Sequence, residues 1–178
     1  MKKCMLVVLL LLLISTPVLA QENNDISQFF QSYLDNGDLS FYASAGYWWG
    51  FCINAGVEYT LGEWNIANIW PIDYGVAVKV LYEGWSYAGY GFESYIGAAP
   101  FFMLHIGVKG TNLDFYEGIG LGFAFYMGNY YSEYNDFEIG FAAVSGVSWY
   151  FSKNMGLILE YAYIGWVSTW GIGITMKL

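Results

Sequence analysis

The sequence predicts an all-β protein: an eight-stranded antiparallel up-and-down transmembrane β-barrel with a short N-terminal amphipathic helix. Three observations predict this fold. From Asp38 onward, apolar side chains alternate with small or polar ones in eight successive segments. Charged residues make up only 12% of the chain and aromatic residues 21%, whereas a soluble domain carries about a quarter charged residues. The less apolar face of the segments is mainly Gly, Ala, Ser and Thr, which suits a narrow interior better than a surface in water.

The first twenty residues have the layout of a secretory signal peptide. Lys2 and Lys3 precede an apolar run from about Met5 to Ile14, and the small residue Ala20 ends the segment. The apolar run is shorter than the roughly 20 residues that a membrane-spanning helix needs. We therefore expect cleavage after Ala20, and a division into a signal peptide (1–20), an N-terminal helix or linker (21–37) and a barrel domain (38–178).

Residues 21–37 predict the short amphipathic helix. Their apolar residues follow i, i+3, i+4, i+7 and i+8 spacing, so that they share one helical face. Two places for this helix stay open, against the end of the domain or in a membrane interface. The residues on the apolar face are Ile26, Phe29, Phe30, Tyr33 and Leu34.

Eight segments predict strands because their apolar residues recur with a period of two. In the stretch FCINAGVEYTL, odd positions from Phe51 to Leu61 are apolar, and even positions from Cys52 to Thr60 are small or polar. No helical pattern separates the segments, which indicates an antiparallel barrel or sandwich. Pro100 predicts a bulge or a strand break. The segments are 39–47, 51–61, 73–83, 96–109, 113–127, 137–151, 155–163 and 170–178.

The apolar face is predicted to point outward, toward lipid. Phe51 and Tyr59 are eight residues apart, as are Tyr74 and Tyr82, which corresponds to roughly 20 Å along a tilted strand. A lipid-facing band about 25 Å tall with aromatic girdles predicts such spacing. The alternative is that these aromatic residues pack inside a soluble sandwich. A sheet in hydrocarbon must close on itself to satisfy its backbone groups, and eight strands suffice for closure.

The titratable residues on the small-residue face are expected to point into the barrel. Unpaired charges there are costly, so we expect these residues to pair and to fill the interior. The alternative is that they line a small pore or gate, although eight strands enclose a space only about wide enough for side chains. The interior polar residues predicted in this way are Glu58, Lys79, His105, Lys109, Glu138, Glu160 and Lys177.

The sequence predicts no catalytic, cofactor-binding or metal site. His105 is the single histidine, so a Cys/His metal cluster is not available, and no serine lies in a nucleophile-elbow context. After cleavage the chain would keep four lysines, no arginine and fifteen acidic residues, which gives a formal charge of −11. A nucleic-acid partner is excluded on this charge.

The leader, the eight alternating segments and the final WGIGITMKL resemble the small outer-membrane β-barrel proteins of two-membrane bacteria, of the OmpA/OmpX-like kind. EYTLGEWNIANIWPIDYG and LHIGVKGTNLDFYEGIGLGF look like segments of spirochaete-type outer-membrane barrels. The resemblance implies a location in the cell outer membrane, contact with outer-membrane lipid, and a structural or surface-interaction role. Such proteins commonly end on Phe or Trp, whereas this chain ends on Leu178.

Two connecting segments, 83–94 and 128–136, are rich in Tyr and acidic residues and suit contact with an extracellular protein or glycan. Two other functions stay open. An outer-membrane lipid-modifying enzyme would need a histidine beside a serine or aspartate near a surface. A soluble secreted lipocalin-like lipid carrier would need the two strand faces inverted.

Overall fold

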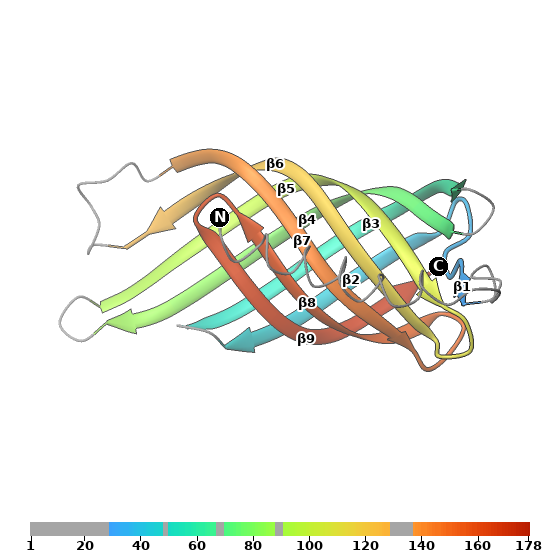
Figure 1. Cartoon of the computed structure of the whole chain (residues 1–178). Coiled ribbons are helices and arrows are strands. Elements are labelled where there is room, and N and C mark those ends of the chain that lie inside the picture. Colours follow the sequence, from blue (N-terminus) through green and yellow to red (C-terminus); the bar gives the residue numbers. More distant parts are fainter. Residues whose placement is uncertain (1–28, 48–49, 67–69, 88–90, 129–136) are drawn as a thin grey trace, which may run out of the picture.

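The barrel is formed by eight strands that close into a ring. The computed structural model describes residues 29–47, 50–66, 70–87, 91–128 and 137–178. Within these residues each strand pairs antiparallel with the next one along the chain, and the last pairs with the first of the ring (Figure 1). This ring confirms the predicted fold class. The eight strands are β2 (Leu39–Tyr47), β3 (Phe51–Ile66), β4 (Trp70–Tyr87), β5 (Gly91–Val108), β6 (Leu113–Met127), β7 (Phe137–Tyr150), β8 (Met155–Ile164) and β9 (Val167–Lys177).

The N-terminal segment differs from its prediction. Residues 29–37 contain a short strand, β1 (Phe30–Gln31), and a turn in place of a helix. β4 pairs with β5 only as far as His105, which leaves the edge of β5 at residues 107–108 open, and β1 pairs there. The helix prediction is wrong for residues 29–37 because Phe30 and Gln31 pair with a distant strand, and the backbone N–H groups of Tyr33 and Leu34 donate to Asp73. Residues 21–28 and the expected signal peptide lie outside the described residues.

Several strands are longer than predicted. β3 continues past a bulge between Thr60 and Gly62 until Ile66 pairs with Trp70. β4 and β5 continue until Tyr87 pairs with Gly91. The segments 62–73 and 83–94, expected as loops, are therefore mostly strand. Of the expected loop 128–136, only Gly128 is among the described residues.

Pro100 does not break its strand. β5 pairs with β4 without interruption through Pro100, which faces Val78. On the other side, the ladder with β6 lacks pairs for residues 99 and 100 and resumes in the same register. Proline has no backbone N–H to donate, so it interrupts one ladder locally. The expectation of a bulge or a strand break at Pro100 is therefore wrong.

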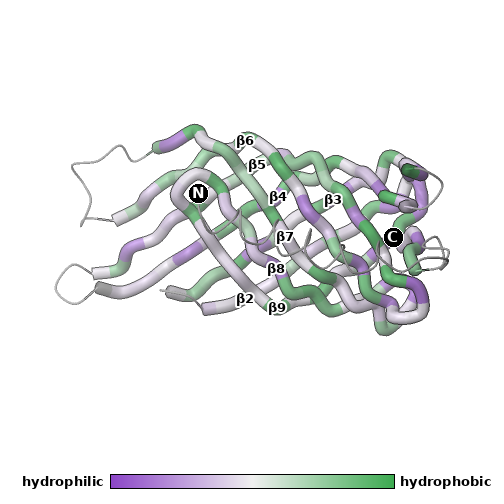
Figure 2. Tube along the Cα trace, viewed as in Figure 1, coloured by the Kyte–Doolittle hydropathy of each residue, from purple (hydrophilic) through white to green (hydrophobic). Residues whose placement is uncertain are grey.

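The apolar face of the barrel points outward, as predicted. Ile53, Val78 and Leu159 are 42%, 52% and 50% exposed, whereas their neighbours Asn54 and Lys79 are buried. Figure 2 shows the apolar positions distributed over all strands of the wall. This orientation contradicts the soluble sandwich and the lipocalin-like carrier, both of which place the apolar face inside. The described residues contain no helix that is long and apolar enough to cross a membrane.

An apolar cluster fills part of the interior, which the sequence analysis did not predict. The β8–β9 turn carries Ile164 and Val167, both fully buried. A Cβ added to Gly97, on β5 at the opposite wall, would lie 3.2 Å from Ile164 Cβ, so the turn reaches across the interior. The larger members of the cluster are Leu81, Phe101, Met103, Tyr116, Val144, Ile164 and Val167.

Candidate functional site in the barrel lumen

A buried ion pair spans the middle of the barrel. Lys79 on β4 donates through Nζ to Oε2 of Glu160 on β8, and each side chain is 1% exposed. The Tyr116 hydroxyl donates to the same Glu160 oxygen at 2.8 Å. Lys79 Nζ also lies 4.2 Å from the centroid of the Tyr42 ring. Side chains from β2, β4, β6 and β8 thus meet at one level of the lumen.

His105 lies between two carboxylates. Its Nδ1 is 2.9 Å from Oδ2 of Asp114, and its Nε2 is 2.9 Å from Oε1 of Glu58. The Tyr42 hydroxyl donates to the other Glu58 oxygen at 2.8 Å. The imidazole also stacks on the Tyr116 ring with centroids 5.3 Å apart. An imidazole donates to two carboxylates at once only when both of its nitrogens carry a proton, so this geometry fits a cation that links two anions.

This geometry gives His105 a structural role. Both ring nitrogens are engaged and the side chain is fully buried, so neither nitrogen is free to accept a proton from a substrate. General-base catalysis requires a nitrogen within hydrogen-bond reach of the proton that it removes. Within the described residues, no group of His, Cys, Asp and Glu side chains could hold a metal ion.

The structure brings together four of the seven predicted interior residues. Glu58, Lys79, His105 and Glu160 are buried in the network of Tyr42 and Tyr116. Glu138 and Lys177 are half-buried and lie toward opposite ends of the barrel. Lys109 is exposed, and its prediction is wrong because β5 ends at Val108 and the alternation ends with it.

Sequence reasoning missed further residues of the lumen. Each occupies an inward position of the period-two pattern, which is the signal that could have found it. Asp114 and Tyr116 alternate with the outward residue Phe115. The missed residues include Tyr42, Asp73, Glu93, Asp114 and Tyr116.

The N-terminal segment closes one end of the lumen through Asp73. Asp73 Oδ1 accepts from the Ser32 hydroxyl at 2.6 Å, and Oδ2 accepts from the backbone N–H groups of Tyr33 and Leu34 at 3.3 Å each. Leu34 is 3% exposed. The Asp73 side chain, which extends from β4, thus holds residues 32–34 inside the mouth of the barrel.

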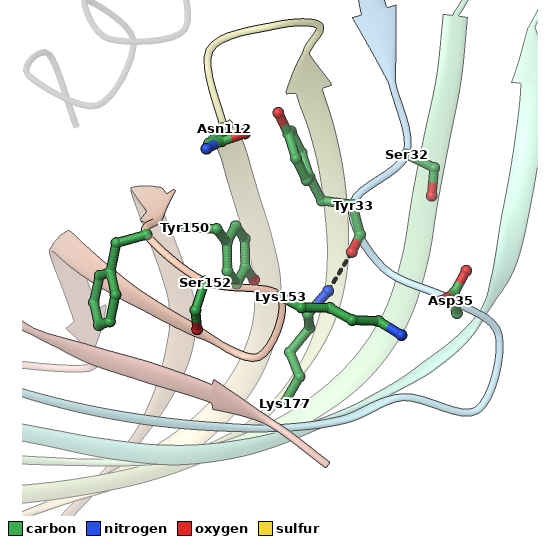
Figure 3. Close-up of a pocket in the computed structure, with 9 residues that line it drawn as sticks. Ser32, Tyr33, Asp35, Asn112, Tyr150, Ser152, Lys153 and Lys177 are labelled. Atoms are coloured by element: carbon green, nitrogen blue, oxygen red, sulfur yellow. Dashed lines mark hydrogen bonds between the residues drawn. The ribbon is translucent and has the colours of Figure 1, made fainter.

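Figure 3 shows how the segment meets the final strand. Lys177 Nζ on β9 donates to the Tyr33 carbonyl at 2.5 Å and lies 4.9 Å from the Tyr150 ring centroid. The Tyr33 ring stacks on Tyr150 with centroids 5.7 Å apart. A cavity of about 430 Å³ adjoins these contacts, and Asn112 and Lys153 are among the residues of its wall. The segment therefore lies between this cavity and the ion pairs deeper in the lumen.

Comparison with known proteins returned solved barrels. No protein-family model matches the sequence, and no curated protein is significantly similar to it. The attachment invasion locus protein Ail of Yersinia pestis is 13% identical, with 82% of this chain and 100% of that chain covered and a TM-score of 0.49. The N-terminal β-barrel domain of Pseudomonas aeruginosa OprF is 17% identical, with 82% and 100% covered and a TM-score of 0.47. The outer membrane enzyme PagL is 13% identical, with 79% and 98% covered and a TM-score of 0.44. The architecture described above rests on the strand pairing of this chain itself.

Proposed function

We propose that this protein is an outer-membrane β-barrel with a structural or surface-interaction role, and that its lumen passes no solute. One observation carries the proposal: a closed ladder with an apolar exterior encloses a filled interior. The N-terminal segment, the ion pairs around Lys79 and His105, and the apolar cluster around Ile164 occupy successive levels of the lumen. A pore would need a continuous path past all three.

Two features support a location in the outer membrane: the apolar outer face of the barrel and the N-terminus of the signal-peptide type. A closed ring with an apolar outer face satisfies its backbone groups inside hydrocarbon, and an N-terminus of the signal-peptide type directs the chain out of the cytoplasm. Both described chain ends lie at the end of the barrel that has the connections 67–69, 109–112 and 151–154, whereas the longest connection, 128–136, belongs to the other end. Short turns of such barrels face the periplasm. The β4–β5 hairpin, which projects at the other end (Figure 1), would then face the outside.

A structural role agrees better with the lumen than catalysis does. The lipid-modifying alternative needs a histidine that substrate can reach, and His105 has both ring nitrogens bound to carboxylates. The outward face of the barrel would contact outer-membrane lipid. Contacts with an extracellular protein or glycan would involve the segments 83–94 and 128–136, as their tyrosines suggest.

Two proteases test the proposed orientation. Residues 128–136, of which 129–136 lie outside the described part of the chain, contain Tyr130, Tyr131 and Tyr134, and no Lys or Arg occurs between Lys109 and Lys153. On intact cells we expect chymotrypsin to cut the protein within 128–136 and trypsin to leave it whole. Resistance to chymotrypsin in intact cells, with cleavage at the same tyrosines after the outer membrane is permeabilised, would contradict the orientation.

A further inference from the structure

The inner wall of the projecting strands carries alternating acidic and aromatic side chains. Along one row of the sheet, Glu83 on β4 pairs with Tyr95 on β5, which pairs with Tyr126 on β6. In the next row, Trp85 pairs with Glu93. The ring centroids of Trp85 and Tyr95 are 5.3 Å apart, and those of Tyr95 and Tyr126 are 5.1 Å apart. Acidic and aromatic residues thus alternate along β4 and β5 and between these two strands, and Tyr126 on β6 adds a second aromatic ring beside Tyr95.

Glu83 is a buried residue of this acidic wall. It is 7% exposed and occupies the same inward register on β4 as Lys79 and Leu81. Within the described part of the chain, no hydrogen bond or ion pair reaches its carboxylate, whereas the neighbouring Glu93 accepts a hydrogen bond from Tyr126. Glu138, on β7, has a buried oxygen, Oε2, that no described residue contacts by a hydrogen bond.

The chain itself has no cation to neutralise these acids. The sequence contains no Lys, Arg or His between Lys79 and His105, between Lys109 and Lys153, or between Lys153 and Lys177. The strand ends and connections around the acidic wall therefore carry no positive side chain. Lys79, the nearest lysine along β4, is already bound to Glu160. A buried carboxylate without a partner is costly, so an external cation would be bound favourably here.

We propose that Glu83, Glu93, Trp85 and Tyr95 form a binding site for alkylammonium cations, with a linear polyamine as the preferred ligand. Carboxylates accept hydrogen bonds from ammonium groups, and the faces of Trp and Tyr attract the same groups through cation–π interaction. Glu83 and Glu93 are diagonal neighbours on adjacent strands, which places their Cα atoms about 7–8 Å apart. Two ammonium groups of one polyamine, separated by a short alkyl chain over the rings, can then each meet one carboxylate. The site goes beyond the proposed function, since it requires the folded barrel and not its location.

Calorimetric titration of the full-length protein with spermidine tests the site. The protein is folded in a maltoside detergent, because that headgroup carries no ammonium. We expect saturable binding that Glu83→Gln weakens at least tenfold and that Glu83→Gln combined with Glu93→Gln abolishes. Glu117→Gln is the matched control, because Glu117 lies half-buried on β6 away from this wall and binds Ser145. Absence of saturable heat, or equal weakening by Glu83→Gln and Glu117→Gln, would overturn the proposal.

Thermal unfolding keeps the test independent of folding defects. Glu83→Gln removes an unpaired buried charge, so the variant should be at least as stable as the parent without ligand. Spermidine should raise the melting temperature of the parent, since a ligand that binds only the folded state stabilises it, and should not raise that of Glu83→Gln. A rise of equal size in both proteins would overturn the proposal. Repeating the titration in dodecylphosphocholine distinguishes two sources of the cation. Loss of the spermidine heat in this detergent identifies a lipid headgroup as a competing occupant of the site. An unchanged heat identifies the free amine as the ligand.

Discussion

Replacing Lys79 with Met should remove the cation of the central ion pair and strongly destabilise the barrel. The side chains of Lys79 and Glu160 are each 1% exposed, so water cannot replace the missing partner. Removing one member of a buried pair costs about 3–5 kcal/mol, because the other charge stays buried and uncompensated. Among the described residues, Glu160 would keep only the Tyr116 hydroxyl as a donor, and Tyr42 would lose its contact with the ammonium. We therefore expect a loss of about 4 kcal/mol.

Equilibrium unfolding in urea, followed by tryptophan fluorescence in lipid vesicles, measures this change. The midpoint should fall with an unchanged slope, since the substitution alters stability and not the surface exposed on unfolding. The control is Lys153→Met: Lys153 lies exposed in the β7–β8 turn, and such surface changes usually stay within about 0.5 kcal/mol.

A double variant separates loss of a charge from loss of packing. Lys79→Met with Glu160→Leu removes both charges, and replacing a buried pair by apolar residues of similar volume is often neutral or stabilising. We expect the double variant to recover most of the stability that the single variant loses. The reasoning would be refuted if Lys79→Met were within about 0.5 kcal/mol of the parent, or if the double variant were as unstable as the single one.

Three further predictions follow from the lumen. His105→Ala should destabilise the barrel by about 3 kcal/mol in the same urea assay, because Glu58 and Asp114 lose their shared donor. Mass spectrometry should find the lipid composition of the cells unchanged by this substitution. An altered composition would favour the lipid-modifying alternative. Asp73→Ala should cost about 1.5–3 kcal/mol and should speed hydrogen exchange at Tyr33 and Leu34, because their backbone N–H groups lose their acceptor. Glu63→Ala, at an exposed position of β3, should leave exchange there unchanged. Deleting residues 21–37 should open no steady conductance in planar bilayers, because Lys79, Tyr116 and Glu160 still fill the middle of the lumen. Ohmic channels formed by the shortened chain would show that these three side chains do not block the barrel.

The strands and the direction of their faces were predictable from the sequence because both follow from local alternation. The bounds predicted for β2 and β6 agree with the structure. The apolar positions of β3 are outside, and its small and polar positions are inside. The decisive signal was the scarcity of charge on the inner face, since an exterior in water would need more charge than these positions carry.

The partners within the lumen were not predictable because they depend on closure of the ring. Lys79 and Glu160 are 81 residues apart in sequence, and four strand-to-strand steps separate β4 from β8 in either direction around the barrel. Alternation shows that both point inward, but it does not show that they meet. The same holds for residues 29–37, whose helical spacing is overridden by pairing with the open edge of β5.

The interior has one part in which the buried acidic groups have cationic partners from the chain and another part in which the sequence supplies no cation. Toward the chain ends and in the middle, Lys79, His105 and Lys177 each lie against a carboxylate or a carbonyl, so the protein neutralises its own buried charge there. Beyond the apolar cluster at Ile164, the wall still carries Glu83 and Glu93 while the sequence supplies no cation. If the interior served only to fill the barrel, apolar residues at these two positions would fill it at lower free energy. Two carboxylates kept beside a run of aromatic rings are explained by a ligand that brings the positive charge with it.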